Sequence, residues 1–359
     1  MTVRLPVASN QHQAVAVFGA AGHTGRFVVA ELLRRGITPI AVARSVAKLA
    51  EFGFEERGIE VRGASAEDPD SLDRAFRGAA AVINCAGPFL DTADAVASAA
   101  IRMGIHYLDV TAEQPSARAT FETFDKAARN AGVLVIPAMG FYGGFADLLV
   151  TTAMGDWDFA DEIMVGIALD RWHPTQGTRV TGEKNTARRM IVANGQLSPM
   201  PLPAAEMDWD FPEPFARQAV VELPFSEIVV IARHTRSSEL HTYLNRTALR
   251  DIRDTTTPPP EPADDEGRSA QVFLVEAIVR NGVHSRRIAA QGRDIYAFSA
   301  PLICEAVQRI LDGRARGSGA QAPGAVFDAR DFLDALPLEH LSFVLSDDEH
   351  RTTSPLSRP

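Results

Sequence analysis

The stretch FGAAGHTGRFVV, from Phe18 to Val29, directly follows the apolar run AVAV, and this junction decides the fold. Gly19, Gly22 and Gly25 stand three residues apart between the apolar run and an amphipathic segment. A glycine-rich turn between a strand and a helix lets backbone N–H groups approach a phosphate, and the helix N-terminus favours its negative charge. The junction therefore predicts a nucleotide-binding strand–turn–helix unit, although its spacing is G-x-x-G-x-x-G rather than the commoner G-x-G-x-x-G.

The first 140 residues repeat this alternation of short apolar runs and amphipathic segments. We expect strands at 14–18, 39–43, 59–62, 81–85, 106–110 and 133–136, and helices at 24–35, 46–52, 69–76, 92–103 and 116–130. Glycines fall where several of these helices should end, as they commonly do at helix C-termini. Strand–helix alternation with short connections predicts an α/β fold, a doubly wound parallel Rossmann sheet over residues 1–140.

Beyond residue 140 the pattern changes to longer apolar runs. Strands are expected at 162–169, 219–222, 239–244, 271–280 and 285–291, and helices at 179–194 and 296–311. Asn281-Gly282 is a hairpin signal between the last two strands, and the proline-rich, acidic segment 255–267 is typical of a solvated loop. We expect a mostly antiparallel α+β domain at 141–345 for substrate binding and dimerisation. The helix at 296–311 would pack back on the first domain, and 346–359 would form a flexible tail.

The composition excludes several classes of function. The 359 residues include 36 basic and 46 acidic side chains, a net charge of −10, without the positive stripe that nucleic acid requires. No apolar run approaches the roughly 20 residues of a membrane helix, and the N-terminus lacks the apolar stretch of a secretory signal. The two cysteines, Cys85 and Cys304, lack metal-ligand spacing. We expect a cytoplasmic protein with a small-molecule substrate and no metal.

Ligands of doubly wound sheets bind beyond the carboxyl ends of the strands, so the residues after each strand carry the cofactor prediction. After the second expected strand, Ala43 stands where a carboxylate would bind the ribose hydroxyls of NAD, and Arg44 follows it. A guanidinium without that carboxylate suits the 2′-phosphate of NADP(H), while a solvated helix start is the alternative. The predicted cofactor-binding residues are Gly19, Gly22, His23, Thr24, Gly25, Arg44, Ser45, Lys48, Asp68, Cys85, Ala86, Gly87 and Pro88.

Four of these residues also have simpler structural interpretations. Asp68 precedes a proline and is first of all a helix N-cap, with a contact to the adenine edge as the second interpretation. Thr24 is a candidate cap for the first helix. His23 is expected to be a loop side chain near the phosphates. Cys85 is expected to be a small buried side chain rather than a nucleophile, because no basic activator lies near it in sequence.

The segments after the fifth and sixth expected strands supply the catalytic candidates. HYLDVTAE and PAMGFYGGFADLL would bring Tyr107, Asp109, Tyr142 and Asp147 to one edge, where they are candidates for proton delivery or substrate orientation. None of the four tyrosines has a lysine four residues later, so the Tyr-x-x-x-Lys pair of short-chain reductases is absent. The predicted substrate contacts are Phe141, Gly143, Thr178 and Arg179, with Arg171, Arg188 and Arg189 as further candidate carboxylate clamps.

Several of these motifs together resemble the saccharopine dehydrogenase-like reductases. They are GAAGHTGR, Arg44-Ser45-x-x-Lys48, INCAGPF, HYLDVTAE, GFYGGFADL and GRDIYAFSAPL. The resemblance implies an NADP-dependent reductase that acts on a C=N bond, as saccharopine reductases do, or on a C=C bond, as trans-acting enoyl reductases do. Gln176-Gly177-Thr178 resembles the Gly-Gly-Thr of the family and implies that Thr178 faces the substrate, with helix capping as the alternative.

One segment departs from the saccharopine reductase pattern. Where those enzymes carry Gly-Leu-Asp-Pro-Gly-Ile-Asp-His, residues 140–147 read GFYGGFAD, without the two aspartates, the proline and the histidine at those positions. This difference argues against saccharopine as the substrate. The missing Tyr/Lys pair also leaves a non-catalytic NADP-sensing regulator of the NmrA-like type as the alternative function. The long second domain is more than such a sensor needs.

Overall fold

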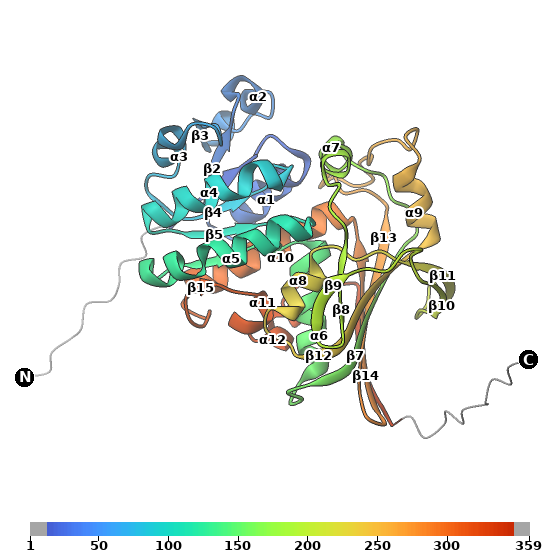
Figure 1. Cartoon of the computed structure of the whole chain (residues 1–359). Coiled ribbons are helices and arrows are strands. Elements are labelled where there is room, and N and C mark those ends of the chain that lie inside the picture. The colour runs from blue at the N-terminus through green and yellow to red at the C-terminus, as the bar shows by residue number, and fades with distance from the viewer. Residues whose placement is uncertain (1–12, 348–359) are drawn as a thin grey trace, which may run out of the picture.

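The structure, a computed structural model, describes residues 13–347 and contains two β-sheets (Figure 1). The first sheet has the strand order β15-β6-β5-β4-β1-β2-β3, with every pair parallel. Its strands are β1 (Ala14–Phe18), β2 (Thr38–Ala43), β3 (Glu60–Gly63), β4 (Ala79–Asn84), β5 (His106–Asp109), β6 (Leu134–Ile136) and β15 (Gly319–Ala320). This order confirms the doubly wound sheet.

Helices cover both faces of the first sheet, which explains its apolar strands. Val15, Ala16 and Val17 are all fully buried, as is usual in a parallel sheet covered on two sides. The helices are α1 (His23–Arg34), α2 (Val46–Ala50), the 3₁₀ turn η1 (Glu55–Arg57), α3 (Pro69–Ala75), α4 (Phe89–Met103) and α5 (Gln114–Ala131).

The second sheet follows the order β10-β11-β12-β7-β13-β14-β16, with β8 and β9 attached beside β12. Only the β12–β7 pair among the described residues of this sheet is parallel, so the mostly antiparallel prediction is confirmed. Asn281 pairs with His284 at the end of the β13–β14 hairpin, where Asn281-Gly282 predicts the turn. The strands are β7 (Ala160–Leu169), β8 (Met190–Ala193), β9 (Gln196–Pro199), β10 (Glu206–Asp210), β11 (Arg217–Glu222), β12 (Ser237–Asn245), β13 (Val272–Asn281), β14 (His284–Arg293) and β16 (His340–Asp347).

The remaining helices join the two sheets. They are the π-helical turn η2 (Phe141–Phe145), α6 (Ala146–Met154), α7 (Gln176–Lys184), α8 (Glu227–Ala232), α9 (Arg246–Arg253), α10 (Ile295–Leu311), α11 (Pro323–Val326) and α12 (Ala329–Asp334). One apolar core contains side chains from both sheets, including Val15 of β1, Val165 of β7 and Phe273 of β13. The described residues contain no helix that is long and apolar enough to cross a bilayer.

The predicted helix at 179–194 is wrong in its second half. The helix α7 ends at Lys184, and β8 begins at Met190. Residues 190–193 read MIVA, and the buried, β-branched pair Ile191 and Val192 packs better as a strand than as a helix. Asn194 and Gly195 both have positive φ and form the turn to β9, which makes Asn-Gly a hairpin signal that the sequence prediction missed.

The segment predicted as a tail is also shorter than expected. Strand β16 runs to Asp347, so residues 346 and 347 pair with β14. The rest of the predicted tail, 348–359, lies outside the described residues.

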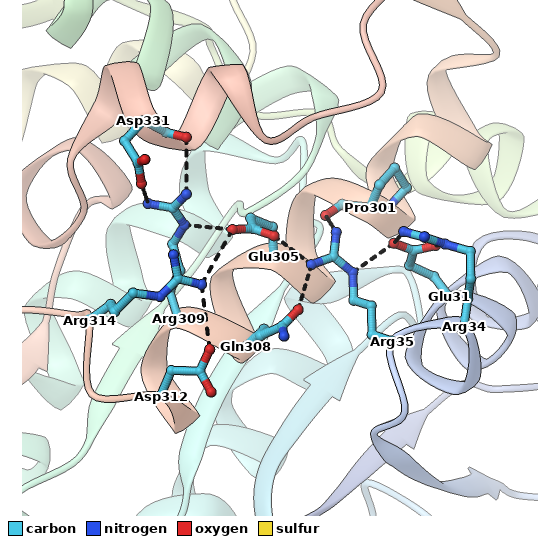
Figure 2. A network of polar contacts seen from close by, with 10 residues as sticks. All are labelled: Glu31, Arg34, Arg35, Pro301, Glu305, Gln308, Arg309, Asp312, Arg314 and Asp331. Atoms are coloured by element: carbon cyan, nitrogen blue, oxygen red, sulfur yellow. Dashed lines mark hydrogen bonds and ion pairs between the residues drawn. The ribbon is translucent and has the colours of Figure 1, made fainter.

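Helix α10 packs against α1 and connects the two halves of the molecule. Figure 2 shows the polar network on this contact, in which Arg35, after α1, reaches Glu305 and Gln308 of α10. Glu305 also accepts a hydrogen bond from Arg309, whose guanidinium contacts Asp331 of α12. The late helix therefore packs against the first domain by both apolar and charged contacts.

Candidate functional site

The turn between β1 and α1 depends on glycine at two close contacts. Gly19 has φ +86°, and a Cβ atom there would lie 2.8 Å from the backbone nitrogen of Ala86. A Cβ atom on Gly25 would lie 2.2 Å from the carbonyl oxygen of Gly19. The N-cap of α1 is Gly22, and no side chain caps this helix, so Thr24 is not its cap. The first N–H groups of α1 are thus not capped by a side chain, as is typical of helix N-termini that bind phosphate.

His23 lies between two aromatic rings rather than in an open loop. Its ring makes edge contacts with Phe27, at a centroid distance of 5.3 Å, and with Tyr296 of α10, at 5.5 Å. Burial lowers the pKa of His23, and its Nε2 atom is buried without a hydrogen-bond partner among residues 13–347. An orphaned ring nitrogen beside the glycine turn is a free contact for a ligand bound there.

The end of β2 carries two exposed cations. Arg44 and Lys48 make no hydrogen bond or ion pair through their side chains within the described part of the chain. The hydroxyl of Ser45 accepts a hydrogen bond from the backbone of Lys48 and so caps α2. Asp68 caps α3 by accepting from the backbone of Ser71 at 3.2 Å, which confirms its predicted role as N-cap.

The turn after β4 is held by side chains on both sides. The amide oxygen of Asn84 accepts from the backbone of Ala86 at 2.9 Å, and Thr92 donates to the Ala86 carbonyl at 2.7 Å. The Gly87–Pro88 peptide is cis. The Cys85 side chain is half-buried, and burial raises the pKa of its thiol, which disfavours the thiolate that a nucleophile needs.

Glu113, which precedes α5 in the segment after β5, completes this turn. Its carboxylate accepts hydrogen bonds from the backbone of Phe89 at 2.7 Å and of Leu90 at 3.3 Å, at the first turn of α4. Burial raises the pKa of Glu113, and these two N–H groups offset part of that effect. A carboxylate at this position anchors α4 to the start of α5.

Tyr107 and Asp109 lie together in the structure. Their polar atoms are already hydrogen-bonded to each other and to the backbone. The Tyr107 hydroxyl donates to Asp109 at 2.7 Å. The other oxygen of Asp109 accepts from the backbone of Thr111 at 2.9 Å and of Ala138 at 2.8 Å. Burial raises the pKa of both groups. This pair fixes the chain segments that leave β5 and β6.

Tyr142, in contrast, has a phenol without a partner. Its ring stacks on Trp172 at 5.3 Å and packs against Phe225 at 4.3 Å. The hydroxyl is buried and makes no hydrogen bond with the described residues, and burial raises its pKa. Of the four catalytic candidates, this phenol alone keeps its polar atom free.

Three other candidates around the same turn have packing roles. Phe141 lies in the core, 4.9 Å from the ring of Phe273. A Cβ atom on Gly143 would lie 2.2 Å from the carbonyl oxygen of Ala138. Asp147 lies on α6, where its two oxygens contact the His234 ring at 2.6 Å and the backbone nitrogen of Gly324 at 2.7 Å. Asp147 therefore joins α6 to the end of α8 and to α11.

Helix α7 lies over the turn that follows β4, and none of its side chains is buried. A Cβ atom on Gly87 would lie 3.0 Å from the hydroxyl of Thr181, and Lys184 forms an ion pair of 2.5 Å with Asp91 of α4. Arg179 donates to the backbone carbonyls of Asp254 and Thr257, so it ties α7 to the proline-rich loop. The helix thus contacts the turn after β4, the start of α4 and the proline-rich loop.

Thr178 is linked to α10 by a hydrogen-bond network. The N-cap of α7 is Thr175, whose hydroxyl accepts from the Thr178 backbone. The Thr178 hydroxyl shares a hydrogen bond of 2.9 Å with the Tyr296 phenol, which also accepts from the indole of Trp172 at 3.0 Å. Thr178 therefore connects α7, the aromatic cluster and, through Tyr296, the ring of His23.

Several residues of this site were not predicted from the sequence. They are Trp172, Phe225, Glu227 and Tyr296, which come from three separate segments of the chain and lie near Tyr142. Tyr296 belongs to the GRDIYAFSAPL motif of the family resemblance, and this motif is the sequence signal that could have identified it. Of the candidate clamps, Arg189 lies over the Phe225 ring at 4.8 Å and donates to the Pro224 carbonyl. Arg188 donates to the Met200 carbonyl instead, and Arg171 pairs with Asp170.

No group of histidine, cysteine, aspartate or glutamate side chains suited to a metal occurs within residues 13–347. The candidate site therefore consists of three parts: the glycine turn after β1, the exposed cations Arg44 and Lys48, and the aromatic cluster around Tyr142. All three lie where parallel strands of the first sheet end or where the second domain packs against those ends.

Comparisons with known proteins agree with this geometry. Residues 19–139 match a family model described as NAD(P)H-binding. A probable mitochondrial saccharopine dehydrogenase-like oxidoreductase of Arabidopsis thaliana is 28% identical over 142 residues, 35% of this chain and 31% of that protein. A lipid droplet localized protein of Caenorhabditis elegans is 32% identical over 146 residues, 37% of this chain and 34% of that protein. The matched regions thus span about a third of the length of these relatives.

A solved structure extends the likeness to the whole fold. Apo saccharopine dehydrogenase (L-Glu forming) from Saccharomyces cerevisiae superimposes with a TM-score of 0.64 and 11% identity, covering 93% of this chain and 100% of that one. Over about a third of its length the chain is thus similar to saccharopine dehydrogenase-like oxidoreductases and matches an NAD(P)H-binding family model, and its two-domain fold resembles that of saccharopine dehydrogenase.

Proposed function

We propose that the protein is an NADP(H)-dependent oxidoreductase that transfers hydride to a C=N or C=C bond of a small organic substrate. The names of the relatives support an oxidoreductase, and the NAD(P)H-binding match supports the cofactor class. The observation that carries the proposal is the glycine cradle at Gly19 and Gly25, which a Cβ atom would fill and which leaves the N-terminus of α1 uncapped. A turn built in this way fits a pyrophosphate.

The residues at the end of β2 favour NADP(H) over NAD(H). Arg44 and Lys48 are exposed and unpaired within the described chain, and Ala43 offers no carboxylate to a ribose. They would hold a 2′-phosphate by charge-assisted hydrogen bonds. The turn from Cys85 to Pro88, beneath α7, would hold the nicotinamide end. When bound, the reduced nicotinamide supplies the hydride.

The substrate would lie against the aromatic cluster at the end of β6. Tyr142, Trp172, Phe225 and Tyr296 contact one another and would form an apolar wall that excludes water and orients a planar group. Arg189, half-buried over Phe225, would bind an acidic group of the substrate. The free hydroxyl of Tyr142 would deliver the proton. Tyr107 and Asp109 would keep the strand ends in place, because their polar atoms are already bonded.

Two further features stay predictions. They are a cytoplasmic location and a homodimer that uses the second domain.

Cofactor binding tests the first part of the proposal. The purified chain should bind NADPH more tightly than NADH in a fluorescence titration. Arg44→Glu should weaken NADPH binding about 10- to 150-fold, the loss expected for one charge-assisted hydrogen bond of about 1.5–3 kcal/mol, while NADH binding changes little. Arg57→Glu, at another exposed arginine outside the site, is the matched control. Tighter binding of NADH by the unmodified chain would disprove the role of Arg44.

A substrate screen tests the second part. NADPH oxidation would be followed with cyclic imines, with mixtures of keto acids and amino acids, and with enoyl esters. Turnover of one class would identify the reduced bond. Binding of NADPH without turnover of any class would favour the non-catalytic sensor.

A further inference from the structure

A buried carboxyl group lies beside the phenol that the proposed function places against the substrate. Glu227 begins α8 and is 0% exposed. One of its oxygens accepts a hydrogen bond of 2.7 Å from the backbone of Phe225, whose ring packs on Tyr142. Its other oxygen, Oε2, has no partner among the described residues.

Two other polar atoms near Glu227 are also buried and unpartnered. They are the hydroxyl of Tyr142 and the hydroxyl of Thr242 on β12. Glu227 acts electrostatically on Tyr142, and Thr242 lies close enough to favour the charged form of Glu227. Buried polar groups are almost always hydrogen-bonded, because an unpaired group loses its contacts with water without replacement. The three atoms lie on η2, α8 and β12, and α8 packs against both of the other elements.

The second domain holds this group against the cofactor edge of the first. The hydroxyl of Ser226 lies 2.9 Å from the carbonyl oxygen of Thr111, the second residue after β5, and also contacts the carbonyl of Tyr142. Ser226 is fully buried. The segment from Phe225 to Glu227 is therefore fixed to the carboxyl ends of the strands, where ligands of this fold bind.

We propose that Glu227 is the proton reservoir of the site and that it recharges the Tyr142 phenol after each reduction. This inference rests on the proposed function. The substrate double bond gains two electrons and one hydrogen from the reduced nicotinamide, and its second atom gains a proton from Tyr142. The O–H bond of Tyr142 breaks in this step, and the phenolate takes the proton of the Glu227 carboxyl. Water returns a proton to Glu227 when product leaves. In this scheme Tyr142 is the catalytic acid and Glu227 acts through it.

The surroundings of Glu227 suit a group that holds and releases a proton near neutrality. Burial raises its pKa to about 7, while the backbone of Phe225, the Thr242 hydroxyl and the Arg189 guanidinium favour the charged form. Arg189 precedes β8, and Tyr142 stands in the turn before α6. Carboxylates on the helices packed against α8 are already paired, Asp147 of α6 with His234 and Asp125 of α5 with Arg129.

Carbon-13 NMR of the side-chain carboxyl groups tests the protonation directly and needs no substrate. In the full chain, one glutamate resonance should titrate near pH 7, and Glu227→Gln should remove it. Glu222→Gln, at a buried glutamate paired with His241 outside the site, should leave that resonance in place. The proposal is overturned if the Glu227 resonance titrates near the ordinary value of 4.5.

Rates separate this proposal from the proposed function. Binding of NADPH by the unmodified chain tests the function, and Glu227→Gln should bind NADPH equally well. With a substrate from the screen, Glu227→Gln should turn over about 100-fold more slowly at an unchanged KM, consistent with the loss of general acid catalysis. Its pH profile should lose the fall in rate above pH 7, and Glu227→Asp should recover part of the rate. If Glu227→Gln keeps the wild-type rate and pH profile, Glu227 is not the reservoir although the function stands.

Discussion

Arg35, at the end of α1, and Glu305, on α10, form an ion pair of 2.5 Å in which both side chains are nearly buried, at 9% and 7% exposure. The two residues are 270 positions apart in the sequence, so this pair joins the Rossmann sheet to a helix from the far end of the chain. Each partner has a second contact, Arg35 with Glu31 and Glu305 with Arg309. The junction of the two halves is therefore a buried charge network (Figure 2).

Removing Arg35 should destabilise the protein more than removing its neighbour Arg34. Arg35→Gln leaves the Glu305 carboxylate short of one cation in a buried place, and we expect a loss of about 3 kcal/mol in the free energy of unfolding. Arg34→Gln is the matched control, because Arg34 also pairs with Glu31 but is 67% exposed, and it should cost less than about 1 kcal/mol. Urea unfolding of both variants measures the difference. If both variants lose the same free energy of unfolding, burial does not determine how much the Arg35–Glu305 ion pair stabilises the protein.

Asp147 should prove to be a structural residue. Burial by itself lowers the pKa of His234, but the contact with Asp147 more than offsets this and raises it above 6.5. A raised folded-state pKa stabilises the protein below pH 6.5, and this stabilisation is lost as the pH rises through the folded-state value. Asp147→Asn should therefore lower the melting temperature, and more strongly at pH 5.5 than at pH 8.5.

The same variant should retain cofactor binding, because Asp147 contacts α8 and α11 rather than the glycine turn. Thermal melts at the two pH values, together with an NADPH titration, measure both effects. A variant with normal stability but no turnover would instead return Asp147 to the catalytic candidates.

Gly25→Ala should weaken both folding and NADPH binding. The added Cβ atom would meet the Gly19 carbonyl at 2.2 Å, so α1 must move away from the turn that it closes. Overpacking of this kind costs about 1–3 kcal/mol. If this whole cost falls on the bound form of the glycine turn, the dissociation constant of NADPH rises about 5- to 150-fold. Gly182→Ala in α7, where a Cβ atom meets nothing within 4 Å, should leave binding unchanged. The comparison of the two dissociation constants is the measurement.

The sequence predicts the first sheet well because its signals are local. Each strand is a short apolar run, and Gly104 and Gly132 adopt the left-handed conformation where α4 and α5 end. The Asn281-Gly282 hairpin is read in the same way. Local patterns of this kind do not depend on where the rest of the chain packs.

The parts that were missed depend on contacts between distant segments. The run EIVVIA after Ser226 carries no helical or catalytic signal, and Glu227 acquires its unusual environment only when α8 packs beside β12 and the Tyr142 turn. Asp147 follows the sixth strand, as expected, but the intervening turn η2 places its carboxylate toward α8 and α11. The aromatic cluster likewise requires residues 142, 172, 225 and 296 to meet in space.

Strand β15 makes the first domain discontinuous in sequence. Gly319 and Ala320 pair in parallel with Leu134 and Val135, and Ala320 donates its amide to Asp125 of α5. A protein truncated after residue 140 would therefore expose the hydrogen-bonding groups of β6 as a bare sheet edge and would lose the helix that covers α1. Such an N-terminal fragment should self-associate rather than fold as an independent nucleotide-binding module. We therefore expect the two halves to unfold as one cooperative unit, because β15 and α10 complete the first domain from the far end of the chain.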